Sequence, residues 1–151
     1  MTSAAGLSEG LLLQFAIASA MLIACVLFHG LGLASLNRAL RSEATVERLR
    51  HIEHLSPRGA IFTLIMVLSI IVLHGVEIWG FAFLYLAIDA IKSLEEALYF
   101  STISYSTVGY SDTHIASQWR LLGAFESILG MILLGWSTAF FFRMLGRIDA
   151  R

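Results

Sequence analysis

The sequence contains one cysteine, one proline and few charged residues. Cys25 has no second cysteine to pair with, and because it lies inside an apolar run we expect a small, inert hydrophobic residue. Charged residues make up 14% of the chain, whereas soluble domains usually carry about a quarter. The net charge of −1 gives no sign of nucleic-acid binding. Residues 1–10 contain no basic residue, so they do not resemble a cleaved signal peptide.

Hydrophobic residues make up 58% of the chain and are concentrated in three runs, at residues 11–36, 60–88 and 121–142. Each run reaches the roughly 20 apolar residues that an α-helix needs to cross a bilayer. The sequence therefore predicts an all-α membrane protein with three transmembrane helices. Region 1–36 is expected to hold the N-terminus and the first of these helices.

Basic residues are unevenly distributed between the segments that join these runs. Segment 89–120 holds only Lys92 and Arg120. The connector 37–59 and the C-terminal end hold the others: Arg38, Arg41, Arg48, Arg50, Arg58, Arg143, Arg147 and Arg151. Because cytoplasmic loops carry the excess of Arg and Lys, we expect a multi-pass protein of the cell (inner) membrane. Its N-terminus is expected outside, and its short tail, 146–151, in the cytoplasm.

The connector itself has two interpretations. Apolar residues recur at every third position among charges, at Val46, Leu49, Ile52 and Leu55. This spacing is typical of an amphipathic helix lying on the inner face of the membrane. A solvated charged linker explains the pattern equally well. His51 and His54 form an H-x-x-H pair there, but two histidines are too few for a structural zinc site.

A shorter helix is predicted at residues 93–105, between the second and third runs. Ser93 followed by Glu96 forms a capping box, which marks the start of a helix. At 1.5 Å per residue, a helix of this length extends about 18 Å, roughly half of a membrane. A half-length helix followed by a polar loop is typical of a re-entrant segment.

The loop that follows this helix reads STVGYSD at residues 106–112. A loop at membrane depth is tolerated only where protein or water surrounds it. The carbonyl groups at its centre lack helical partners and are suited to replacing the hydration shell of a cation. These carbonyls belong to Thr107, Val108, Gly109 and Tyr110. Gly109 permits backbone angles that a residue with a Cβ resists. Because rings of such carbonyls are built from four loops, a homotetramer is implied.

The order of these segments resembles the pore module of potassium channels, and more narrowly the bacterial small potassium-channel family. The resemblance rests on HGVEIWGFAFLYL at 74–86, SLEEALYFSTISYSTVGYSD at 93–112 and WRLLGAFESILGMILLGWSTAFFF at 119–142. It implies a pore domain over 60–145, made of an outer helix 60–88, a pore helix 93–105, a filter 107–112 and an inner helix 119–145. It also implies passive conduction of K⁺ across the lipid bilayer, with K⁺ bound at the four central filter residues. No cofactor and no enzyme activity are expected.

The resemblance also implies residues that support the filter. Asp112 should hydrogen-bond Tyr99 of the pore helix, although a solvated aspartate is the plain alternative, and Ser106 flanks the filter. The family has a second glycine after the filter tyrosine, where this chain has Ser111. A serine held at positive φ would cost on the order of 1 kcal/mol or more. Two alternatives follow: a weakly selective cation channel loosened at Ser111, and a non-conducting membrane scaffold subunit.

Three ionisable residues interrupt the second and third runs: His74, Glu77 and Glu126. Charges at this depth are costly, so they are expected to have partners. We expect Glu77 or Glu126 to hydrogen-bond the pore helix, and we count Glu126 among the supports of the filter. The three residues form a candidate pH-sensitive network; a neutral structural network and a transition-metal site are the alternatives. His29 lies nearer the inner end of its run and is not expected to meet His74.

The third run carries candidate gating residues. Gly130 and Gly135 are candidate bending points, with close helix packing by small residues as the alternative. Trp136 and Phe140 are candidates for an apolar constriction that gates by dewetting. No run bears the repeated arginines of a voltage sensor.

Overall fold

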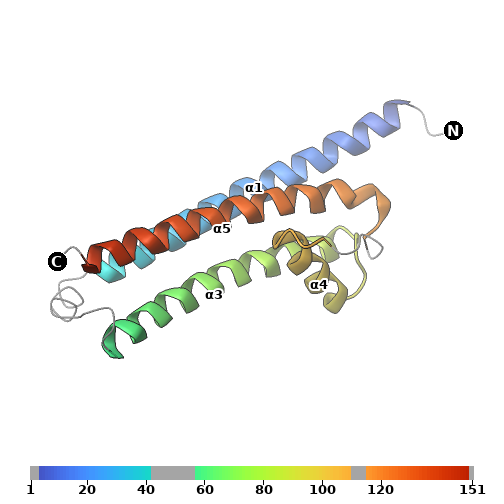
Figure 1. Ribbon diagram of the computed structural model, residues 1–151. Helices are drawn as coiled ribbons and strands as arrows, with labels where there is room; N and C mark the ends of the chain where they lie inside the picture. Colours follow the sequence, from blue (N-terminus) through green and yellow to red (C-terminus); the bar gives the residue numbers. More distant parts are fainter. Residues whose placement is uncertain (1–3, 42–56, 110–114, 150–151) are drawn as a thin grey trace. The chain divides into compact units, whose positions relative to one another are not determined.

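The computed structural model describes residues 4–41, 57–109 and 115–149. Helices account for most of these residues, and no strand occurs among them. In chain order the elements are α1 (Ala4–Arg41), α3 (Pro57–Ala87), α4 (Leu94–Tyr105), the 3-10 turn η1 (Ser117–Trp119) and α5 (Arg120–Asp149) (Figure 1). The all-α fold predicted from the sequence is therefore confirmed.

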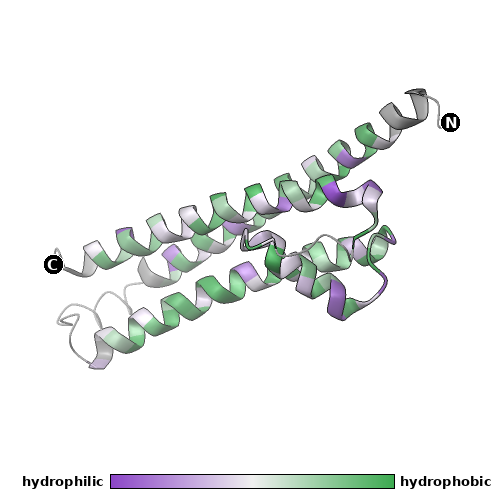
Figure 2. Cartoon of the chain, turned by 45° about the vertical axis from the view of Figure 1, so that its right-hand side comes forward, coloured by the Kyte–Doolittle hydropathy of each residue, from purple (hydrophilic) through white to green (hydrophobic). Residues whose placement is uncertain are grey.

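Three of the described helices, α1, α3 and α5, are long and apolar enough to cross a membrane. Their spans are Gly10–Ala39, Gly59–Ala87 and Ser117–Gly146, and Figure 2 shows them coloured mostly as hydrophobic. The prediction of three such helices is confirmed. Helix α1 extends beyond its apolar run at both ends, because the Ala, Leu, Glu and Arg residues there also favour helix. The predicted connector helix, with His51 and His54, lies outside the described residues.

Local signals set the ends of α3. Pro57 is its first residue, a position where the missing N–H of proline removes no hydrogen bond. The helix ends in a Schellman turn, in which the N–H of Asp89 donates to the carbonyl of Leu86 at 3.1 Å and the N–H of Ala90 donates to the carbonyl of Tyr85 at 2.9 Å. Asp89 takes the left-handed conformation, with φ of 53°, which aspartate tolerates better than most residues. This turn ends the span and leads the chain into α4.

Helix α4 begins where its capping box predicts. Ser93 is the N-cap, and its hydroxyl oxygen accepts the N–H of Glu96 at 3.1 Å. Glu95 and Glu96 lie in the first turn, where negative charge is favoured by the helix dipole. The buried face consists of Ala97, Phe100, Ser101, Ile103, Ser104 and Tyr105. The buried face of α4 is therefore mostly apolar but also carries the hydroxyl groups of Ser101, Ser104 and Tyr105.

The long helices contribute to two compact units. The first unit comprises Met1–Val26 and Val76–Leu133 and contains α4, whereas the second comprises Leu27–Gly75 and Leu134–Arg151. The core of the first unit is apolar and includes Phe81, Tyr85, Phe100, Leu122 and Leu129. The buried apolar side chains of the second unit include Leu33, Met66 and Met144.

Large apolar side chains also cover the outer surfaces of the helices. Leu12, Ile65 and Met131, one on each long helix, are all more than half exposed in the single chain. Such surfaces suit contact with lipid or with another subunit, because neither environment hydrates them.

Candidate functional site

The chain leaves α4 through a short loop whose N–H groups bond back to the helix. The N–H of Thr107 donates to the carbonyl of Ser104 at 2.9 Å, and the N–H of Gly109 donates to the carbonyl of Ile103 at 2.9 Å. These bonds satisfy carbonyl groups that the last turn of a helix leaves without a partner. The loop is thereby fixed to the C-terminal end of α4.

The carbonyl oxygens of the same loop have no such partners. Within the described part of the chain, the carbonyls of Thr107, Val108 and Gly109 accept no hydrogen bond. All three residues are exposed, and Val108 is 54% exposed. A carbonyl without a protein donor at membrane depth needs water or another polar ligand. The loop therefore offers acceptor oxygens to a ligand, while the N–H groups of Thr107 and Gly109 are bonded to α4.

Thr107 and Gly109 both adopt the left-handed backbone conformation, with φ of 62° and 57°. The sequence predicts this freedom for Gly109, but it does not predict it for Thr107. A β-branched residue at positive φ is an outlier that costs on the order of 1 kcal/mol or more. Thr107 stands directly after the C-cap of α4, where glycine is usual. Backbone strain of this kind concentrates at functional sites, so the conformation of Thr107 supports a functional role for this loop.

The outer part of the predicted filter is not among the residues that the structure describes. Tyr110, Ser111 and Asp112 all fall in that part. The bond between Asp112 and Tyr99, and the strain at Ser111, therefore stay predictions. Tyr99 is 49% exposed on α4. Ser106 is the exposed C-cap residue of α4, which places it directly before the loop.

Two buried carboxylates hold α4, and the first is Glu126 on α5. The hydroxyl of Tyr85 donates to Glu126 Oε2 at 2.5 Å, and the hydroxyl of Ser101 lies 2.5 Å from Glu126 Oε1. Ser101 Oγ also lies 2.9 Å from the carbonyl oxygen of Ile78. Because a hydroxyl has one proton, both contacts of Ser101 are satisfied when Glu126 carries a proton and donates it to Ser101. Glu126 thus joins α3, α4 and α5 in one buried network.

The second carboxylate is Glu77 on α3. The hydroxyl of Tyr105 donates to Glu77 Oε2 at 2.5 Å, and both side chains are buried. Burial and the bond to Glu77 raise the pKa of Tyr105 above its ordinary value, so its hydroxyl remains a donor at neutral pH. Tyr105 is the last residue of α4, so this bond positions the start of the loop. The sequence predicts that Glu77 or Glu126 bonds this helix; in the structure, both do.

Replacing Glu126 with glutamine should preserve its network, whereas replacing it with alanine should break it. A glutamine amide donates to Ser101 and its carbonyl accepts from Tyr85, so we expect stability near that of the parent. Alanine leaves the buried Tyr85 hydroxyl without its acceptor, removes the carboxyl partner of Ser101 and creates a cavity, which should lower the free energy of unfolding by about 2–4 kcal/mol. Thermal unfolding in detergent, followed by circular dichroism, measures both effects. Equal loss in Glu126→Gln and Glu126→Ala would show that a charged carboxylate is required.

A family model described as ion channel matches residues 71–147, just over half of the chain. The matched residues include all of α4, its loop, Glu77 and Glu126. The chain belongs to this ion channel family. No curated protein and no solved structure matches the chain. The channel region begins within α3, so α1 lies outside the matched residues.

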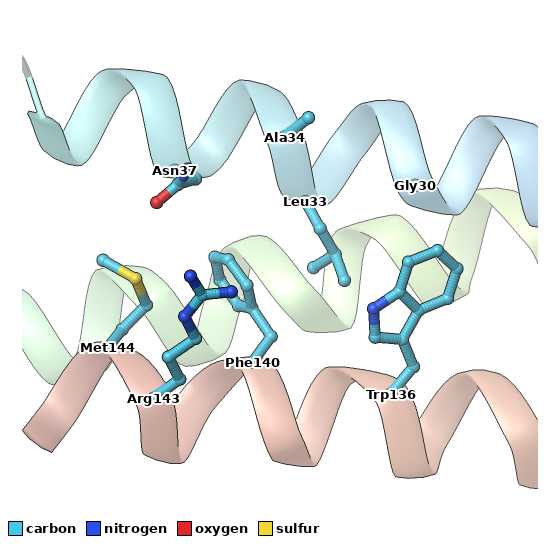
Figure 3. A pocket seen from close by; sticks show the side chains of 8 residues that line it. All are labelled: Gly30, Leu33, Ala34, Asn37, Trp136, Phe140, Arg143 and Met144. Carbon is cyan, nitrogen blue, oxygen red and sulfur yellow. The ribbon is translucent and has the colours of Figure 1, made fainter.

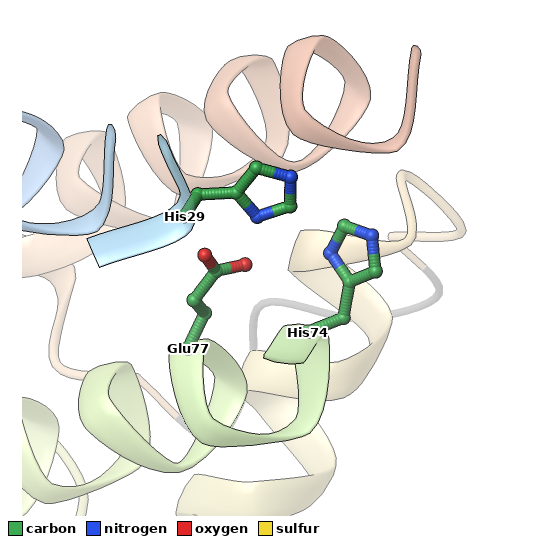
Figure 4. Close-up of side chains that lie close together, drawn as sticks. All are labelled: His29, His74 and Glu77. Atoms are coloured by element: carbon green, nitrogen blue, oxygen red, sulfur yellow. The ribbon is translucent and has the colours of Figure 1, made fainter. Parts of the chain in front are cut away.

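The second unit of the channel contains a buried cluster of two histidines and a serine. His29 on α1 and His74 on α3 each place Nε2 at 3.0 Å from the hydroxyl oxygen of Ser137 on α5. Their ring centroids are 5.0 Å apart with the ring planes tilted by 41°, and Figure 4 shows the two rings next to each other. The prediction that His29 does not meet His74 is wrong. It relied on depth counted from the edges of the apolar run, and α1 is longer than that run.

The hydrogen bonds of this cluster differ from those of the two carboxylates. His74 bonds Ser137, whereas Glu77 bonds Tyr105 and Glu126 bonds Ser101. Ser137 can donate to one imidazole and accept from the N–H of the other, so its hydroxyl bridges the two rings. The pH-sensitive network of His74, Glu77 and Glu126 stays a prediction, as do its alternatives, a neutral structural network and a transition-metal site.

The two candidate bending glycines of the channel have different surroundings. A Cβ added to Gly130 would overlap the carbonyl oxygen of Tyr105, which belongs to the backbone at the end of α4. A Cβ added to Gly135 would meet nothing within 4 Å. Close packing therefore accounts for Gly130, while Gly135 lies in open space and remains the candidate bending point of α5.

Trp136 and Phe140, the candidate constriction, line a pocket between α1 and α5 (Figure 3). The Trp136 ring lies 5.5 Å from the His29 ring, centroid to centroid. Both residues are thus in contact with the neighbouring helix of their own chain. The neighbouring residue Phe142 is 65% exposed and is therefore better placed to meet the pore or another subunit.

Sequence reasoning missed several partners of the buried ionisable residues, namely Tyr85, Tyr105, Ser101 and Ser137. One signal was available for two of them. Ser101 and Tyr105 are four residues apart, so they share a face of the helix predicted at 93–105. Two hydroxyls on the buried face of a short membrane helix indicate acceptors on the helices that flank it.

Proposed function

We propose that four copies of this chain form a channel that conducts K⁺ selectively and passively. The proposal depends on one observation, the loop that follows α4. The N–H groups of Thr107 and Gly109 are bonded to the helix, while the carbonyls of Thr107, Val108 and Gly109 accept nothing in the described part of the chain. Carbonyl oxygens of such loops replace the water around K⁺ in selectivity filters. Tyr110 would extend the same series of ligands.

The four-fold assembly follows from how little one chain supplies. One loop provides oxygens on one side of an ion only, whereas a filter surrounds the ion with four loops. Identical subunits achieve this by closed rotational symmetry. The chain also has apolar surface available for contacts between subunits, because Ile128, Met131 and Ile132 on α5 are all more than half exposed.

The orientation proposed for the channel uses the basic residues at the ends of its helices. Arg38, near the end of α1, and Arg143, near the end of α5, are both exposed. Because basic residues are retained on the cytoplasmic side, we place these two helix ends on the cytoplasmic side of the cell membrane and the N-terminus on the external side. The loop after α4 then lies toward the external side.

A weakly selective cation channel is the second candidate, and the backbone of Thr107 favours it. A filter that already holds a β-branched residue at φ of 62° is strained at its inner end. Serine in place of the family glycine at position 111 would add strain at the outer end. Both candidates conduct cations, and they differ in the ratio of K⁺ to Na⁺ permeability.

Reconstitution of the purified full-length chain tests the proposal. Liposomes that contain the protein, loaded with K⁺ and diluted into Na⁺ buffer, should release K⁺. The total K⁺ released should equal the amount that a K⁺ ionophore releases from the same liposomes. In planar bilayers, the bi-ionic reversal potential should correspond to a K⁺ preference of at least about tenfold, which is about 1.4 kcal/mol of discrimination. Cross-linking should give a ladder that stops at four chains.

Each other result contradicts part of the proposal. A reversal potential near zero would favour the weakly selective channel. Absence of flux together with absence of a four-chain species would favour a non-conducting scaffold subunit.

A further inference from the structure

A pocket between α1 and α5 in the second unit is not explained by ion conduction. Its volume is about 180 Å³. From α1 it is lined by Leu33 and Asn37, and from α5 by Trp136, Phe140 and Arg143. Figure 3 shows Arg143, Phe140 and Trp136 extending from α5 toward α1, with Leu33 and Asn37 facing them.

The lining of this pocket changes from polar to apolar along the helices. Asn37 lies two residues before the end of its span at Ala39, and Arg143 three residues before the end of its span at Gly146. Trp136 lies about 10 Å deeper than Arg143 along α5, at 1.5 Å per residue. The pocket thus begins with a guanidinium and an amide near the membrane surface and continues between apolar side chains.

The guanidinium of Arg143 is exposed at one end of this pocket. Among the residues whose side chains the structure describes, no carboxylate pairs with Arg143. Arg143 is the basic residue in the lining of the pocket. A guanidinium binds phosphate oxygens with charge-assisted hydrogen bonds, and its planar donors suit two oxygens at once.

We propose that this pocket binds one anionic phospholipid. The lipid phosphate is held by Arg143 and Asn37, and the upper part of one acyl chain lies between Leu33, Phe140 and Trp136. The volume equals that of about six water molecules, at about 30 Å³ each, so it admits a segment of one chain. Basic pockets between transmembrane helices are a recurrent way of recognising anionic lipids. The proposal does not depend on K⁺ selectivity, because it concerns only α1 and α5.

Bound lipid would connect α1 to the part of α5 that contains Gly135 and Ser137. A chain segment beside Trp136 restricts the same indole that packs against His29. Helix α1, which lies outside the residues matched by the channel family, thereby acquires a role as one wall of a lipid site.

Quenching of Trp136 fluorescence by brominated lipid tests the proposal. The full-length chain with Trp79→Phe and Trp119→Phe keeps Trp136 as its one tryptophan. In phosphatidylcholine vesicles, phosphatidylglycerol with chains brominated near the headgroup should reach half-maximal quenching at a mole fraction about fivefold lower than brominated phosphatidylcholine, as expected for one arginine contact. Arg143→Gln should abolish the difference. Arg120→Gln, at the opposite end of α5, should retain it.

Equal quenching by the two lipids, or a preference that survives in Arg143→Gln, would overturn the proposal and favour a protein surface as the occupant. If the tryptophan substitutions prevent folding, native mass spectrometry of the otherwise unaltered protein gives the same decision. Retained phosphatidylglycerol should then be lost in Arg143→Gln and kept in Arg120→Gln. Retention by both variants would again refute the site.

Discussion

Gly130→Ala should lower the stability of the channel more than alanine substitutions at Gly109, Gly135 or Gly146. The added Cβ would overlap the carbonyl oxygen of Tyr105 and lie 2.8 Å from its carbonyl carbon. Backbone atoms cannot move aside as a flexible side chain does, so either α5 or the end of α4 must shift. Overpacking of this kind costs about 1–3 kcal/mol, occasionally more. We expect a lower midpoint of thermal unfolding and loss of ion flux in liposomes.

Gly135→Ala provides the matched control, because a Cβ there meets nothing within 4 Å. The substitution replaces a poor helix former with the best one, so stability should stay equal or rise by up to about 1 kcal/mol. If Gly135 is a bending point, open probability changes although the unfolding midpoint does not fall. A Gly130→Ala variant that unfolds like the parent would show that α4 does not approach α5 at this position.

If the loop after α4 is the proposed filter, Gly109→Ala should remove selective conduction while leaving the helices folded. Gly109 holds φ of 57° in open space, so alanine meets no neighbouring atom but must adopt a left-handed conformation. That conformation costs roughly 1–2 kcal/mol per residue, and a tetramer would carry the strain four times. Tenfold discrimination between ions needs only about 1.4 kcal/mol. A strained loop should therefore reduce K⁺ flux or the K⁺ to Na⁺ permeability ratio by at least about tenfold.

Helical content and assembly separate this effect from misfolding. Circular dichroism and size-exclusion elution of Gly109→Ala should match the parent, because the N–H bonds of the loop to α4 involve no side chain of residue 109. Gly146→Ala, another glycine in open space but within α5, should conduct normally. Unchanged selectivity in Gly109→Ala would contradict a role for this backbone in coordinating the ion.

The fold was predictable because its signals are local in the sequence. Apolar runs long enough to span a bilayer identify α1, α3 and α5, and the pair Ser93 and Glu96 identifies the start of α4. Each of these signals arises within one helix or one helix turn. No knowledge of neighbouring helices is needed to interpret them.

The candidate site was predictable only in part, because its remaining features depend on contacts between helices. The loop sequence indicates Gly109, but the left-handed angle of Thr107 arises from how the loop bonds back to Ser104. Likewise, the need for glycine at position 130 comes from the backbone of Tyr105, which is distant in sequence. The meeting of His29 with His74 was predicted wrongly because helix length and tilt are not determined by hydropathy.

The anchoring of α4 has a mechanical consequence. This short helix is fastened through Ser101 to Glu126 on α5 and through Tyr105 to Glu77 on α3, and its last turn is bonded directly to residues 107 and 109. Sliding or rotation of α5 against α3 would therefore displace α4 and change the positions of the carbonyl groups of residues 107–109. A movement of either long helix within this unit is thereby coupled to the conformation of the loop after α4.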